Sequence, residues 1–221
     1  MNLRDLFWFV VERVPHSTWR SFTWLGDSGL LLPAALMITV WLALSRRTWP
    51  SAALWVVLFG CGASLILASK LAFMGWGIGS ARFNFTGFSG HTAISASVWP
   101  VMLWLVSSRA PRWQRMGLVL FAWALAAAIG VSRLALMAHS VSEVAAGFVL
   151  GVAVSATFLL LQHRQQHPQL WWPVVVVSFL MPLLVQTPGA PAPTQNLLEQ
   201  IAVELAGIER PYTREDLLRQ G

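Results

Sequence analysis

Six long apolar segments dominate this sequence and decide what it can fold into. They cover residues 27–45, 51–73, 91–107, 115–132, 142–162 and 169–186. A helix needs about 20 mostly apolar residues to cross a bilayer, and inside lipid only helices or closed barrels satisfy their backbone groups. A chain with 56% hydrophobic and 11% charged residues is also no ordinary soluble domain. The sequence therefore predicts an all-α, polytopic membrane bundle with about six transmembrane helices.

Shorter regions flank these segments. Residues 1–26 mix charges with a short apolar run and lack the features of a signal peptide, so we expect an interfacial helix that ends near Pro15. Asp27 then begins the first span as a helix cap. We expect three parts in all: this N-terminal segment, a six-helix domain over 27–186, and a C-terminal tail over 187–221.

The C-terminal tail begins with a proline-rich stretch, which predicts a stiff linker. Four aliphatic residues then recur at helical spacing: Leu198, Ile201, Leu205 and Ile208. This spacing predicts a short amphipathic helix docked on the bundle. Pro211 ends it, and Thr213 with Asp216 fits a capping pair for one more turn.

The net charge of +6 comes from three short loops that contain no acidic residue. Their basic residues are Arg46, Arg47, Arg109, Arg112, Arg115 and Arg164. The other nine of the 15 basic residues are balanced by nine acidic ones. Arginine-rich loops on alternate sides are typical of the cytoplasmic face of a membrane protein. We therefore expect the membrane as a partner, no nucleic acid, and an outward position for the loops after the second and fourth segments.

The remaining polar residues of interest lie between positions 70 and 143, at the expected outer ends of the segments. They are Lys70, Arg82, Ser89, Gly90, His91, Arg133, His139 and Glu143. Ionisable groups at membrane depth are costly and usually have a task. Ser89-Gly90-His91 stands where a loop becomes a helix, so free N–H groups and the helix dipole favour an anion there. Ordinary capping by Ser89 is the alternative.

Three cations on one face point to the same anion. Lys70 is the only lysine of the chain and, with Arg82 and Arg133, lies on the face of the two histidines. Two cations about 4 Å apart repel by about 4 kcal/mol at an effective dielectric near 20, so they imply a multivalent anion such as phosphate between them. His91 and His139 supply the acid and the nucleophile that phosphoryl transfer needs.

Glu143 follows His139 by one helical turn. At this spacing its carboxylate can orient the imidazole. Ser140 and Glu143 also fit a capping box at the start of the fifth span, and the two roles are compatible.

The order of these motifs resembles the type 2 phosphatidic acid phosphatase family, which is related to vanadium haloperoxidases. Lys70 and Arg82 correspond to its first motif, Ser89-Gly90-His91 to the second, and Ser132-Arg133 with His139 and an acid to the third. Three positions depart from the family pattern. Arg82 lies further from Lys70 than usual and lacks the following proline, Phe88 replaces a proline, and Glu143 replaces an aspartate.

The resemblance implies a lipid phosphate phosphatase of the bacterial inner membrane, and the charge pattern makes its site face the periplasm or exterior. His139 forms a phosphohistidine in this scheme, while His91 protonates the leaving oxygen and then activates water. The phosphate oxygens are held by Lys70, Arg82, Arg133, Ser89 and the Gly90 amide, with no metal or other cofactor. His163 and His167 lack a third ligand, so we expect no metal site there either. The lipid itself is not named by the sequence.

The sequence leaves three alternatives for the function. Gly87-Phe88-Ser89-Gly90 also fits the Gly-x-Ser-Gly motif of rhomboid proteases, in which Ser89 and His139 form a proteolytic dyad. A non-catalytic lipid-binding or scaffold protein of the same fold is the second alternative. The third is phosphate transfer to another lipid instead of water.

Overall fold

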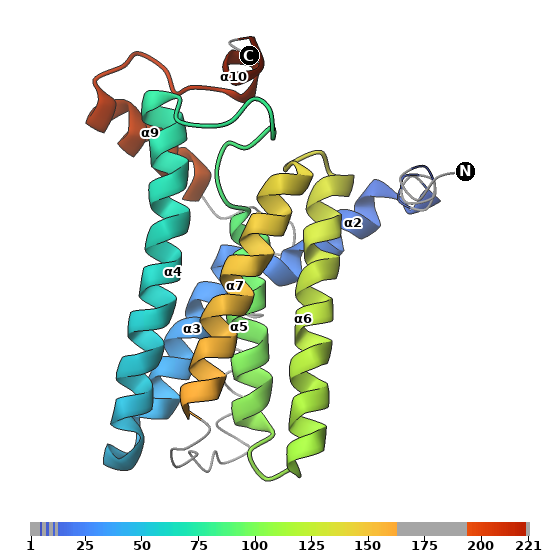
Figure 1. The fold of residues 1–221 in the computed structure, drawn as a ribbon, viewed down its shortest axis with the longest axis vertical. Coiled ribbons are helices and arrows are strands. Elements are labelled where there is room, and N and C mark those ends of the chain that lie inside the picture. The colour runs from blue at the N-terminus through green and yellow to red at the C-terminus, as the bar shows by residue number, and fades with distance from the viewer. Residues whose placement is uncertain (1–4, 6–7, 9–10, 12, 163–193, 220–221) are drawn as a thin grey trace.

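The structure is a computed structural model that describes residues 5, 8, 11, 13–162 and 194–219. Helices make up the regular structure of these residues, together with one isolated bridge between Ser80 and Phe85. Figure 1 shows a bundle of long helices with the C-terminal helices packed at one end of it. The expectation of an all-α membrane bundle is confirmed.

The long helices correspond to the first five predicted segments. They are α3 (Ser28–Ala43), α4 (Trp49–Trp76), α5 (Gly90–Val106), α6 (Arg112–Ala135) and α7 (Val141–Gln162). Four helical stretches are long and apolar enough to cross a membrane: His16–Ala43, Arg46–Trp76, Arg112–Ala135 and Val141–Gln162. The shorter α5 is apolar as well. The predicted sixth span, 169–186, lies outside the described residues.

Helix α5 is the centre of the bundle. It packs against α3, α4, α6 and α7, and Val98, Val101 and Leu105 on it are completely buried. Since its neighbours surround it, α5 carries the hydrophobic core on several faces instead of one stripe. Its N-terminus therefore lies in the middle of one end of the bundle.

Two glycines let α7 approach α5 closely. A Cβ atom on Gly147 would lie 2.7 Å from the carbonyl oxygen of Ser89, and one on Gly151 would overlap the carbonyl oxygen of Ala93. Small residues allow this kind of backbone contact between membrane helices. The contact fixes the first turn of α7 against the first turn of α5.

The chain before α3 runs across the bundle. Helix α2 (His16–Thr23) packs against α6, and Figure 1 shows it crossing the direction of the long helices. Of the preceding residues, the described ones are helical up to Arg13, which agrees with a helix that ends near Pro15.

The C-terminal tail docks on the end of α4. Helix α9 (Thr194–Ala206) packs against α4, and the backbone N–H of Tyr212 donates to the carbonyl of Met74 at 2.8 Å. Leu217 of α10 (Arg214–Arg219) is buried in a small core with Phe73 of α4. The predicted capping pair is confirmed, because the Thr213 hydroxyl and N–H both donate to Asp216.

Candidate active site

A pocket of about 890 Å³ opens at the end of the bundle where α5 begins. It lies between this end and the docked tail, and α3, α4, α5, α6 and the tail all contribute residues to its wall. Five predicted site residues line it: Lys70, Gly90, His91, Arg133 and His139. Residues far apart in the sequence are thus brought together around one space.

His139 and Glu143 form the most closely coupled pair of the site. The His139 Nδ1 atom lies 2.7 Å from Oε2 of Glu143, whose side chain is completely buried. The Ser140 N–H also donates to Oε2, and the Glu143 N–H donates to the Ser140 hydroxyl. The predicted contact of Glu143 with His139 and the predicted capping box are therefore present together. With Nδ1 donating to the carboxylate, Nε2 is the ring nitrogen left for chemistry.

Thr86 holds the other oxygen of Glu143. Its N–H and its hydroxyl donate to Oε1 at 2.8 and 2.6 Å. A buried carboxylate needs its oxygens satisfied in this way, because an unpaired one is strongly destabilising. The sequence offered no reason to connect Thr86 with Glu143.

The surroundings keep His139 uncharged. Burial lowers the pKa of His139, and the positive charges of Lys70 and Arg133 lower it further, although the Glu143 carboxylate partly raises it. The net direction is downward from the ordinary value. A neutral imidazole at pH 7 is the form that can act as a nucleophile.

His91 faces a second carboxylate. Its Nε2 atom lies 3.6 Å from Oδ2 of Asp27, while Oδ1 of Asp27 accepts from the Gly29 N–H at 2.8 Å. The predicted cap is confirmed, but the contact with His91 was missed. The sequence signal for this contact was the position of Asp27 at the expected outer end of the first span. The carboxylate is placed to interact with a protonated His91, the form that a general acid requires.

The pocket offers two cations and a helix N-terminus to an anion. Lys70 reaches it from α4, ahead of the last turn of that helix, and Arg133 reaches it from the last turn of α6. Arg133 donates through Nη1 to Thr23, and its Nε atom is buried with no hydrogen-bond partner among the described residues. Gly90 lines the pocket at the start of α5, whose N-cap Ser89 makes no capping bond with its side chain. Free N–H groups at this position favour phosphate.

Ser89 lies underneath the pocket. It is completely buried. Its hydroxyl lies 3.0 Å from the Thr92 hydroxyl, and its N–H donates to the carbonyl of Glu143. The backbone bond joins α5 to α7, and Ser89 is not among the described residues that line the pocket.

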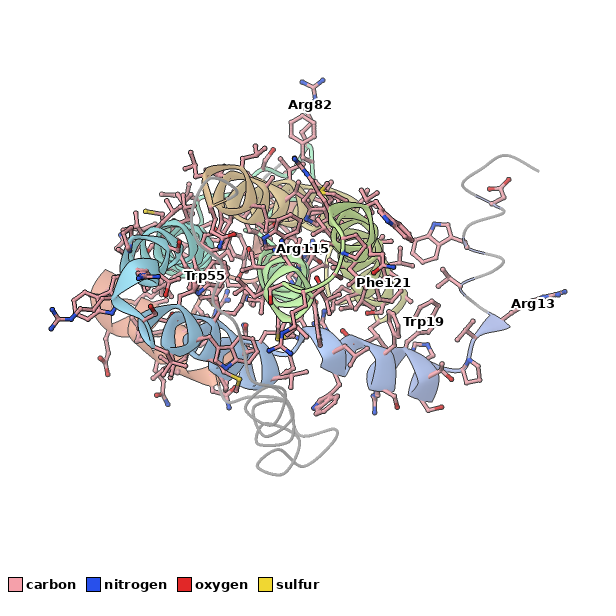
Figure 2. All side chains as sticks on the ribbon, turned by 90° about the horizontal axis from the view of Figure 1, so that it is seen from below. Arg13, Trp19, Trp55, Arg82, Arg115 and Phe121 are labelled. Atoms are coloured by element: carbon pink, nitrogen blue, oxygen red, sulfur yellow. The ribbon has the colours of Figure 1, made fainter. Side chains whose placement is uncertain are left out.

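The structure does not bring Arg82 to the pocket. Its side chain is exposed and its Cζ atom lies 5.5 Å from the centre of the Phe83 ring. Figure 2 shows Arg82 projecting away from the bundle. The unusual spacing from Lys70 accounts for this, because the added residues form a loop that extends beyond the helix ends.

Arg214 is a further residue at the site that the sequence did not point to. Its Nη2 atom donates to both oxygens of Glu143, at 2.9 and 2.8 Å. Its Nη1 atom donates to the side-chain and backbone oxygens of Asn84. The sequence predicted only that a short helical turn begins next to Arg214.

No group of three or more His, Cys, Asp or Glu residues is arranged to hold a metal ion in the part of the chain that the structure describes. His163 and His167 lie outside that part. The cationic side chains of the pocket instead present positive charge directly.

Fold and site together define an apolar helical bundle with a pocket at one end that is lined by two histidines and two cationic side chains. A sequence model of the PAP2 superfamily matches residues 67–167, a range that includes Lys70 and Glu143. The chain is also 44% identical over 205 residues to a Klebsiella pneumoniae protein described as "Uncharacterized 22.5 kDa protein in cps region". That alignment covers 91% of this chain and 98% of the relative. No solved structure matches the chain.

The chain belongs to the PAP2 superfamily. Members of this superfamily are phosphatases, so at the level of class the protein is of the phosphatase type.

Proposed function

We propose that this protein is an integral membrane phosphatase that hydrolyses a phosphomonoester or pyrophosphate of a lipid through a phosphohistidine. One observation carries the proposal: His139 and His91 line the same pocket as Lys70 and Arg133, and His139 is paired with a buried carboxylate at 2.7 Å. A nucleophile, an acid and two phosphate-binding cations thus lie around one space.

In the first step the Nε2 atom of His139 attacks phosphorus, and the bond from phosphorus to the leaving oxygen breaks. His91 gives its proton to that oxygen. In the second step His91 takes a proton from water, the oxygen of that water attacks phosphorus, and the bond between phosphorus and nitrogen breaks. Inorganic phosphate is released and both histidines return to their starting states.

Positive charge stabilises the transition state of both steps. Lys70, Arg133 and the N–H groups at the start of α5 surround the position where charge accumulates on the phosphate oxygens. Removing one preorganised donor of this kind typically costs about 3–4 kcal/mol of transition-state stabilisation. We propose that these groups do the work without a metal ion.

A lipid fits the remainder of the pocket wall. Ile66 and Leu67 of α4, Ile94 of α5, and Leu198 and Ile201 of α9 line it beside the polar groups. An amphiphile can place its phosphate at the histidines and its apolar part against these side chains. The turns that contain Arg46, Arg47 and Arg109 lie at the other end of the bundle, which supports an outward site.

The protease alternative finds less support. A dyad requires the Ser89 hydroxyl to interact with His139, whereas it is directed to Thr92 and His139 is directed to Glu143. A scaffold protein without activity would not need a neutral histidine that is oriented by a carboxylate and lies near two cations. Transfer to a lipid acceptor uses the same first step and differs only in the second.

The test is release of inorganic phosphate by the purified protein in detergent. Phosphatidic acid, phosphatidylglycerol phosphate and undecaprenyl pyrophosphate are supplied with a chelator present, with and without vanadate. We expect release from at least one lipid, inhibition by vanadate, and an acid-labile phosphate label on His139 in the quenched protein. Absence of release and of label with every lipid would contradict the proposal.

A further inference from the structure

The C-terminal tail inserts one arginine into the core of the active site. Arg214 is about one-third exposed, yet its guanidinium reaches the completely buried carboxylate of Glu143 at 2.8 Å. The two residues are 71 positions apart in the chain. This contact bears on function, because Glu143 is also the partner of His139, the proposed nucleophile.

Arg214 supplies a positive charge in direct contact with Glu143. Glu143 also accepts from Thr86, Ser140 and His139. These donors are neutral when His139 is in its nucleophilic form. Among the hydrogen-bond donors to Glu143 in the described residues, Arg214 alone carries a permanent charge. A buried carboxylate without a counter-ion is strongly unfavourable. Arg214 is the counter-ion in direct contact with Glu143, and Lys70 adds a further positive charge nearby.

Both terminal nitrogens of the Arg214 guanidinium donate to protein oxygens. Nη2 is used on both oxygens of Glu143, and Nη1 is used on Asn84, whose backbone φ of 48° turns the loop toward the tail. An arginine held in this fork binds in one fixed geometry. It is therefore placed to act on His139 through Glu143.

The tail is built to present this side chain. The Tyr212 ring packs on Gly77 at the end of α4, where a Cβ atom would lie 3.3 Å from the ring. The Tyr212 N–H is bound to Met74, and Thr213 and Asp216 cap the turn that begins at Arg214. Leu217 anchors the other side of that turn in the small core against α4.

We propose that Arg214 is a positioning residue of the reaction, which makes the tail part of the catalytic unit. It holds Glu143 ionised and in place, so that Glu143 fixes the ring of His139 with Nε2 toward the pocket. This inference deepens the proposed function and rests on it for the role of His139 as nucleophile.

The main test compares Arg214→Gln with Arg219→Gln, a control on the same helix whose side chain is 79% exposed. Removing the charge of Arg214 lets the His139–Glu143 pair take up a proton at higher pH. Since the nucleophile must be neutral, the acid limb of kcat/KM should move to higher pH in Arg214→Gln. We also expect kcat to fall about 10- to 100-fold with KM changed less than about threefold. Arg219→Gln should match the wild type in every respect.

The groups that face His139 from the surrounding elements are kept constant in this comparison. They are Lys70 on α4, His91 on α5, Arg133 on α6 and Glu143 on α7, with Asp27 beyond His91. A change in the pH profile therefore reports the missing charge of Arg214. Loss of a purely structural contact would lower the melting temperature without moving that profile.

Two further variants keep the test valid if Arg214→Gln folds poorly. Arg214→Lys retains the charge and should restore the wild-type pH profile while recovering kcat only in part, because lysine cannot form the same fork. Asn84→Gly removes the side-chain partner of Nη1 but tolerates the positive φ. It should give a smaller change in the same direction as Arg214→Gln.

A measurement without turnover separates this inference from the proposed function. Diethyl pyrocarbonate modifies neutral imidazole, and peptide mass spectrometry reports the rate at His139 as a function of pH. The midpoint should rise in Arg214→Gln and stay at the wild-type value in Arg219→Gln. If no lipid is hydrolysed but the midpoint rises, the proposed function fails and the coupling stands. An unchanged midpoint and an unchanged pH profile in Arg214→Gln would overturn the inference.

Discussion

At the scale of single residues, the site depends on two histidines that each face a carboxylate. His139 is paired with Glu143 at 2.7 Å, and His91 lies 3.6 Å from Asp27. The shorter contact belongs to the proposed nucleophile, whose ring must be fixed in one orientation. The longer one belongs to the proposed acid, which must release its proton. The different distances therefore match the different tasks.

His139 and Ser89 should differ sharply when mutated. His139→Ala removes the nucleophile and should abolish phosphate release. Ser89→Ala removes a buried hydroxyl that is directed to Thr92 and should destabilise the protein by about 1–3 kcal/mol while leaving measurable turnover. Phosphate release and thermal unfolding in detergent measure the two effects. Equal loss of turnover in both variants, with no labelled histidine in the wild type, would favour the serine protease alternative.

Lys70 and Arg82 belong to one motif in the sequence but should behave differently. Lys70→Ala removes a cation of the pocket wall and should lower kcat/KM by about 2–4 kcal/mol. Arg82→Ala should leave kcat/KM near the wild-type value, because its side chain projects away from the bundle (Figure 2). The kinetics of both variants on the same lipid decide the matter. A large loss in Arg82→Ala would show that the loop moves Arg82 into the pocket when substrate binds.

At the scale of elements, the contact between α5 and α7 sets the geometry of the site. The first turn of α7 carries Glu143, and Gly147 one turn later lies against Ser89. The apolar pattern of each helix predicted its existence and its approximate bounds. It gave no register between them, because register depends on which small residues face each other.

Gly147→Ala tests this contact. The added methyl group meets backbone atoms of Ser89 that cannot rotate away, so α7 must shift. We expect a loss of about 1–3 kcal/mol in stability and a fall in kcat as Glu143 is displaced. Gly117→Ala on α6 is the matched control, because a Cβ atom there has no neighbour within 4 Å. Wild-type stability and activity in Gly147→Ala would mean that the two helices have room to adjust.

At the scale of the whole molecule, the site and the arginine-rich turns lie at opposite ends of the bundle (Figure 1). On the positive-inside rule we propose that those turns lie in the cytoplasm. In this orientation the proposed site would face the outer side, within reach of a lipid headgroup of the outer leaflet.

Cysteine labelling in intact cells tests this orientation. In a Cys61→Ser background, Ile78→Cys lies at the end that carries the site, and its native side chain is 66% exposed. Arg112→Cys lies at the other end and is exposed as well. A maleimide that cannot cross the membrane should label position 78 and not position 112. The reverse pattern would place the site in the cytoplasm.

The sequence by itself determined the features that depend on neighbours in the chain. Apolar runs of sufficient length fixed the helical class, and the spacing of one turn between His139 and Glu143 fixed their pairing. The cap of Asp27 and the capping pair of Thr213 with Asp216 are local in the same way. Each follows from the geometry of a single helix or turn, which nearby residues impose.

Only the tertiary structure decided which distant groups share the pocket. Arg82 fits a sequence motif but lies on an exposed loop, whereas Arg214 fits none and reaches Glu143 from the C-terminal tail. The contact between Asp27 and His91 has the same origin. These contacts depend on how the helices pack and where the tail docks, and packing is a property of several elements at once that no local pattern encodes.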